Sequence, residues 1–128
     1  MISLPHPVRV FLHTPATDLR KGFDALSGLV TTAFSQDPMS GHLFLFVNRR
    51  RDRLKILYWD RDGLAIWYKR LEKGSFQLPE VASDAVSIEM SPTQLTLILS
   101  GIDLGSARQR KRYQRPTPKS EKSIGAPL

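Results

Sequence analysis

The sequence predicts an α+β domain whose mostly antiparallel sheet has about four to five strands. At 128 residues the chain is long enough for one hydrophobic core and too short for two. Short runs of β-branched and aromatic residues alternate with two segments of helical periodicity. We therefore expect a single domain over residues 1–105, with one long N-terminal helix and one short C-terminal helix, followed by a disordered basic tail over residues 106–128.

The N-terminal part predicts a strand followed by the long helix. Apolar residues alternate over residues 8–13, and Pro15 then ends the run because it has no N–H for a sheet. Thr17 can cap a helix, and Asp18 suits a first turn. Apolar residues recur at helical spacing from there to Phe34. We therefore predict a helix from Thr17 to Phe34 that covers the sheet.

Residues 43–71 predict a ribbon of three consecutive strands. The run 43–47 is apolar on both faces, as in a central strand. The runs 54–59 and 64–71 follow, joined by the Asp-Arg-Asp-Gly sequence of residues 60–63, where Asp-Gly is a strong hairpin signal. The connection between the first two strands carries four arginines, Arg49, Arg50, Arg51 and Arg53.

The C-terminal part predicts one more strand and the short helix. Alternating apolar residues over 86–90 indicate a half-buried strand. The helix Ser91–Leu99 begins with a capping box, in which the first residue pairs with Gln94 and Pro92 stands at the first helical position. Gly101 suits the helix C-terminus. We expect this helix to lie beside the longer one.

Basic charge is concentrated in two regions of a chain whose net charge is +7. From Ser106 onward there are seven basic residues and one acidic residue. Residues 48–73 hold nine basic and four acidic residues, so the rest of the folded part is acidic. Two separate basic regions favour a polyanionic partner, most often nucleic acid. The alternative is a solvated face with a solubilising tail.

Several classes of function find no support in the sequence. There is no cysteine for disulfides or thiolate metal sites, and the three histidines lack ligand spacing. Asp60 and Asp62 begin like a calcium loop, but its remaining ligands are missing. No phosphate loop or nucleophile motif is present. We expect no enzymatic activity, metal, cofactor, small-molecule substrate or membrane segment, and a cytoplasmic location.

Nucleic-acid binding is the function that the cations favour. A two-stranded ribbon can enter the major groove, where arginines pair with phosphates or guanine edges. Aromatic residues can instead stack on unpaired bases, although core packing is the alternative for at least one of each neighbouring pair. The candidate DNA-binding residues are Arg49, Arg50, Arg51, Arg53, Lys55, Lys69, Arg70, Arg108, Arg110, Lys111 and Arg112. The candidate stacking residues are Tyr58, Trp59, Trp67 and Tyr68.

Several blocks of the sequence resemble a known family. They are Asp18-Leu19-Arg20-Lys21-Gly22-Phe23-Asp24, residues 40–44, residues 51–60, and residues 62–64 followed by 67–72. Together they resemble the TnpB accessory protein of the insertion sequence 66 family of bacterial transposable elements, over roughly residues 2–104. The resemblance implies a small accessory protein encoded beside a separate transposase of the carboxylate-triad type. It also implies a role in transposition and carries over no catalytic residue.

Two functions remain open at this point. In the first, the arginine-rich connection and the tail bind DNA and assist the transposase. In the second, the chain is a protein-interaction module that docks on the transposase without itself binding DNA. Salt dependence distinguishes them, because contacts to several phosphates weaken steeply with salt and apolar burial does not.

Overall fold

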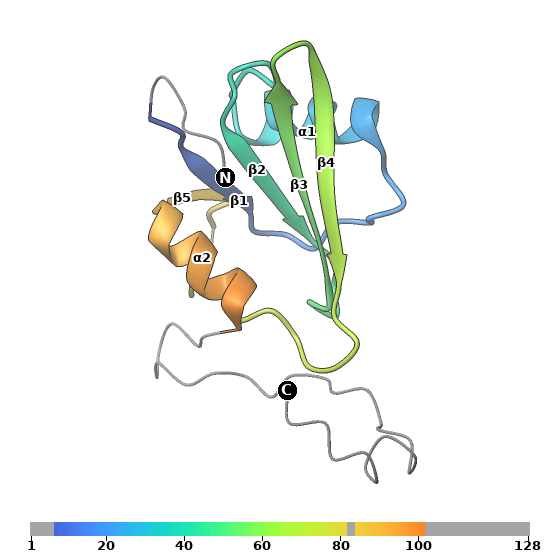
Figure 1. The fold of residues 1–128 in the computed structure, drawn as a ribbon, viewed down its shortest axis with the longest axis vertical. Coiled ribbons are helices and arrows are strands. Elements are labelled where there is room, and N and C mark those ends of the chain that lie inside the picture. The colour runs from blue at the N-terminus through green and yellow to red at the C-terminus, as the bar shows by residue number, and fades with distance from the viewer. Residues whose placement is uncertain (1–6, 82–83, 102–128) are drawn as a thin grey trace, which may run out of the picture.

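The computed structural model describes residues 7–81 and 84–101, and these form a mixed α+β fold with a five-stranded sheet and two helices (Figure 1). The elements, in chain order, are β1 (Val10–His13), α1 (Phe23–Ala33), β2 (Leu43–Val47), β3 (Arg53–Asp60), β4 (Gly63–Arg70), β5 (Ser87–Met90) and α2 (Pro92–Ser100). The predicted α+β class is confirmed. The predicted domain boundary at residue 105 and the tail lie outside the described residues.

The strand order across the sheet is β4-β3-β2-β1-β5, which makes β2 the central strand. β1 and β2 pair in parallel, whereas β1–β5, β2–β3 and β3–β4 are antiparallel. A parallel pair needs a long crossover, and the segment containing α1 supplies it. Phe44, Leu45 and Phe46 of β2 are fully buried, so the prediction of a central strand covered on both faces is confirmed.

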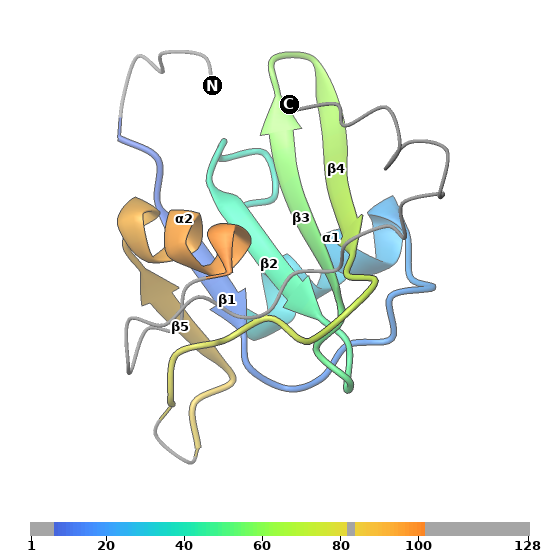
Figure 2. The ribbon, with the colours of Figure 1, turned by 60° about the horizontal axis from the view of Figure 1, so that its bottom comes forward.

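The two helices cover opposite faces of the sheet, as two views show (Figures 1 and 2). On the α1 face, the ring of Phe34 packs against Phe44 at 5.3 Å and against Phe46 at 5.7 Å between centroids. On the α2 face, Leu45 and Ile98 belong to a second buried cluster. The expectation that the helices lie side by side is therefore wrong. Both faces of β2 are apolar, and each needs its own cover.

The long N-terminal helix is also wrong, because α1 begins only at Phe23. The N–H of Thr17 donates to the carbonyl of Val47 at 2.9 Å, which ties this segment to the sheet. Asp18 accepts from the backbone N–H of Arg20 at 3.0 Å, a local bond that competes with helix formation. Gly22 is the residue that precedes the helix, and its backbone is extended.

The predicted start and end of the short helix are confirmed. Ser91 Oγ accepts from the N–H of Gln94 at 3.1 Å, and Gln94 Oε1 accepts from the N–H of Ser91 at 2.9 Å. Gly101 closes the helix at φ 83°, in the left-handed region that favours glycine. Neither helix in the described part of the chain combines the length and the apolarity needed to cross a bilayer.

We predict that stability depends on the protonation state of His13, at the end of β1. Its ring lies 5.8 Å from that of Phe34 and 5.7 Å from that of Phe46, and its Nδ1 is 3.0 Å from Thr17 Oγ1. Burial lowers the pKa of His13 below its ordinary value of 6.5. The unfolded chain therefore binds the proton more readily, and the free energy of unfolding should fall as the pH drops below about 6.5.

Urea denaturation at a series of pH values around and below about 6.5 measures the free energy of unfolding. In the variant His13→Gln, this free energy should depend less steeply on pH. The wild-type decline should level off once the pH is below the pKa in the folded state. An identical pH dependence in the two proteins would contradict the assignment to His13.

Candidate nucleic-acid interface

The turn between β2 and β3 is held by the side chain of Asn48. Its Oδ1 accepts from the N–H groups of Asp52 at 3.1 Å and Arg53 at 3.0 Å, and its Nδ2 donates to Asp52 Oδ1 at 2.7 Å. The N–H of Arg51 donates to the carbonyl of Asn48 at 3.0 Å. These bonds satisfy the polar groups of the turn locally, so its backbone is fixed without any ligand.

The segment that follows β4 braces the same turn from the other side. The N–H of Leu71 donates to the carbonyl of Asp52 at 2.7 Å, and that of Phe76 donates to the carbonyl of Arg51 at 2.6 Å. Phe76 is buried in the core cluster on the α2 face. The turn is therefore connected to the core through backbone hydrogen bonds as well as through its own strands.

Arg51 has a positive φ of 60°. An L-residue in the left-handed region costs about 1–2 kcal/mol, a cost that glycine avoids. Ser35 and Arg61 share this conformation, so the positive φ marks a tight turn and does not by itself assign a role to the Arg51 side chain.

The four arginines of the turn, Arg49, Arg50, Arg51 and Arg53, are all exposed. Across residues 7–81 and 84–101, none of their guanidinium groups lies within ion-pair distance of a carboxylate. The acidic residue of the turn, Asp52, is instead bonded to Asn48. Clustered like charges repel one another unless an anion relieves them. The turn therefore presents a cationic surface suited to phosphate.

Three further predicted cations lie near the turn, and two of them have other contacts. The β3–β4 register pairs Arg53 with Arg70 and Lys55 with Tyr68, which puts these side chains on the α1 face. Arg70 Nε pairs with Glu72 at 2.8 Å. Lys55 Nζ donates to the carbonyl of Lys21 at 2.9 Å and lies 5.0 Å from the centroid of the Tyr68 ring. Lys69 is paired with Leu54, a residue of the core cluster on the α2 face, and so lies on that face.

The four predicted stacking residues do not form one platform. Tyr68 lies on the α1 face, and its hydroxyl accepts from Arg53 Nη1 at 3.4 Å. Trp67 is paired with Ile56 and so lies on the α2 face with Tyr58, which packs against the core there. Trp59 is at the far end of β3, where its Nε1 donates to the carbonyl of Arg61. Trp67 and Tyr68 are exposed, by 40% and 48%.

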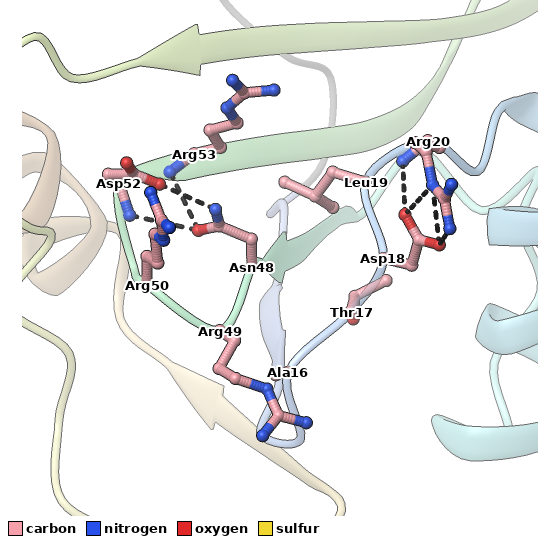
Figure 3. A pocket seen from close by; sticks show the side chains of 10 residues that line it. All are labelled: Ala16, Thr17, Asp18, Leu19, Arg20, Asn48, Arg49, Arg50, Asp52 and Arg53. Atoms are coloured by element: carbon pink, nitrogen blue, oxygen red, sulfur yellow. Dashed lines mark hydrogen bonds and ion pairs between the residues drawn. The ribbon is translucent and has the colours of Figure 1, made fainter.

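A cleft beside the turn includes residues that the sequence analysis did not assign to the site (Figure 3). One wall is the turn, and the other is the segment Ala16–Arg20. Arg20 Nη2 pairs with Asp18 at 2.7 Å, and this guanidinium holds the pKa of Asp18 well below its usual range. The Asp-Leu-Arg sequence was the available signal, but it fell within the helix predicted from Thr17 to Phe34, so Arg20 was not assigned to the site.

Within the described residues, no group of three histidine, aspartate or glutamate side chains is placed to hold a metal ion. The four predicted cations of the tail, Arg108, Arg110, Lys111 and Arg112, lie outside the described residues, and their role stays a prediction.

A small α+β domain with a rigid, arginine-rich turn is a candidate polyanion-binding module. The sequence profile of the family described as IS66 Orf2 like protein matches residues 8–109. The chain belongs to this family, as the resemblance of its motifs had predicted. No solved structure matches the chain.

Two relatives from Sinorhizobium fredii extend over nearly the whole chain. The uncharacterized proteins y4jC and y4hO are 37% and 38% identical to it over 117 residues. The matched region is 91% of this chain and 97% of each relative.

We predict that Arg51→Gly separates binding from stability. Glycine tolerates the positive φ, so the free energy of unfolding should stay unchanged or rise by up to about 1 kcal/mol. Retention of duplex DNA in a gel-shift assay should decrease, because one cation of the turn is lost.

The matched control is Arg50→Gly, which removes the same charge from a residue whose φ is not positive. Here glycine relieves no strain, so the added freedom of the unfolded chain should destabilise the fold by about 0.5–1 kcal/mol. Equal effects of the two substitutions on stability would show that the backbone at Arg51 is unstrained.

Proposed function

We propose that this protein is a non-catalytic accessory factor for transposition of an insertion sequence, and that it binds DNA through the turn between β2 and β3. Membership in the IS66 Orf2-like family supports the transposition context. The observation that carries DNA binding is the cluster of four exposed arginines, which have no carboxylate partner among the described residues. The partners are then DNA and the transposase of the same element.

The shape of the turn suits this task. The β2–β3 hairpin projects its cations from a braced backbone, so little backbone conformational entropy is lost when DNA is bound. Guanidinium groups can pair with phosphate oxygens or, in the major groove, with guanine edges. Arg70 and Lys55 lie beside the turn on the α1 face and extend the cationic surface. The basic tail adds affinity that is independent of sequence.

We predict that replacing Arg49, Arg50, Arg51 and Arg53 by alanine abolishes retention of duplex DNA in a gel-shift assay. If all four contact phosphates, the slope of log K against log salt should become shallower by about 3 to 4. The fold should persist, because these side chains are exposed.

The control is Arg61→Ala, which removes an exposed cation from the turn at the far end of the β3–β4 hairpin. This control should retain DNA like the wild type. Unchanged retention by the quadruple variant, with circular dichroism confirming its fold, would falsify the assignment to the turn.

A second candidate function is docking on the transposase without DNA. The observation in its favour is β4, which lies at the edge of the sheet and carries the exposed Trp67. An edge strand can accept a strand from another protein, and an exposed tryptophan is a common anchor.

For this candidate we predict that Trp67→Ser weakens capture of the purified transposase at least about tenfold, whereas raising the salt from low to moderate concentration changes it little. Tyr68→Ser, on the opposite face of the same strand, is the control. Capture that is lost with salt but insensitive to Trp67→Ser would indicate that the cations mediate the contact.

A further inference from the structure

The cleft between the turn and the segment Ala16–Arg20 has a volume of about 600 Å³. The cleft is open to solvent, and its volume is comparable to that of small-ligand sites and far too small for the body of a DNA duplex. Figure 3 shows Asp18 and Arg20 on one wall and Arg49, Arg50 and Arg53 on the other. The cleft therefore has room for one nucleotide-sized group, with cations available on both sides.

Hydrogen bonds hold the two walls in place. The N–H of Thr17 donates to the carbonyl of Val47, the last residue of β2, at 2.9 Å. Leu19 extends from the first wall into the core cluster on the α1 face and is only 8% exposed. Asn48 fixes the opposite wall through its three side-chain hydrogen bonds. A ligand entering the cleft meets preformed walls, which reduces the entropy cost of binding.

The lining residues carry a net charge of +2. Arg20, Arg49, Arg50 and Arg53 contribute four positive charges, and Asp18 and Asp52 contribute two negative ones. Each carboxylate already has a partner, since Asp18 pairs with Arg20 and Asp52 accepts from Asn48. A phosphate monoester carries −1.5 to −2 charges near neutral pH, whereas a phosphodiester carries only one. The charge of the cleft therefore matches a monoester more closely than a diester.

We propose that this cleft binds the phosphate monoester at the end of a DNA strand. This inference rests on the proposed DNA binding and adds to it a terminal phosphate as the recognised group. Arg49 and Arg50 contact the phosphate from the turn, and Arg20 contacts it from the opposite wall while its pairing with Asp18 fixes its direction. Arg51, which does not line the cleft, remains available to the duplex that leaves it.

Fluorescence anisotropy with two short blunt duplexes tests the proposal on the full chain. The duplexes share one sequence and differ only in a 5′-phosphate or a 5′-hydroxyl, and a 3′-phosphorylated duplex is the third probe. A preference of about tenfold for one of the phosphorylated ends is expected, since a charge-assisted hydrogen-bonded contact is gained. Equal affinity for all three probes overturns the proposal and leaves the proposed DNA binding intact. Failure to bind any of them refutes both.

The decisive variant is Arg20→Gln, because Arg20 lies outside the turn in the sequence. It should remove the preference for the phosphorylated end, since it deletes a cation and leaves Asp18 unpaired against the phosphate. Arg61→Gln, in the turn at the far end of the β3–β4 hairpin, is the charge-matched control and should keep the full preference. If the folded Arg20→Gln variant keeps the preference for the phosphorylated end, the proposal that both walls of the cleft contact the phosphate is wrong.

Competition with a free deoxynucleoside 5′-monophosphate separates a strand end from a small molecule. If the cleft binds a strand end, the mononucleotide displaces the phosphorylated duplex only weakly, because it lacks the contacts of the duplex to Arg51 and its neighbours. Displacement at a concentration similar to that of the duplex itself overturns the proposal in favour of a nucleotide site.

Discussion

Burial of β2 on both faces is the constraint on which the arrangement of this protein depends. Every residue of β2 is apolar, so both faces of this strand need a covering layer, and α1 and α2 supply one each. Because the chain crosses from β1 to β2 through α1, the segment after β1 must pass the end of β2. The hydrogen bond from Thr17 to Val47 holds it there. Core packing thus places residues 16–20 beside the arginine-rich turn.

The turn itself opposes stability. It combines a left-handed arginine with three neighbouring arginines, and one of these, Arg53, forms a cross-strand pair of like charge with Arg70. The rest of the fold compensates by local means, through the side chain of Asn48 and the backbone bonds from Leu71 and Phe76. Strain and repulsion that are braced in this way favour function over folding as the reason for the arginines.

The sequence predicted those features that depend on local chemistry. The capping box at Ser91, the central position of residues 43–47 and the arginine-rich connection all follow from residue type and spacing over a few positions. The start of α1 could not be predicted in this way. The N–H of Thr17 donates to Val47, and Asp18 accepts from the N–H of Arg20, so these bonds replace the expected helical cap. The cleft could not be predicted either, because its walls are about thirty residues apart in the chain and are brought together by the parallel pairing of β1 with β2 and by the hydrogen bond from Thr17 to Val47.

The register of the strands and the positions of the carboxylates divide the cations into two groups. Side chains in a strand alternate between faces, so the register of β3 with β4 sends Lys55 and Arg70 to the α1 face and Lys69 to the other. Arg70 and Arg20 have carboxylate partners that fix their direction, whereas the arginines of the turn have none among the described residues. A guanidinium held in one direction favours recognition of a single ligand group in one orientation. Unpaired guanidinium groups favour contacts with successive phosphates of a nucleic-acid backbone. The presence of both kinds of cation beside one another supports the proposals that the turn binds DNA and that the cleft recognises the end of a strand.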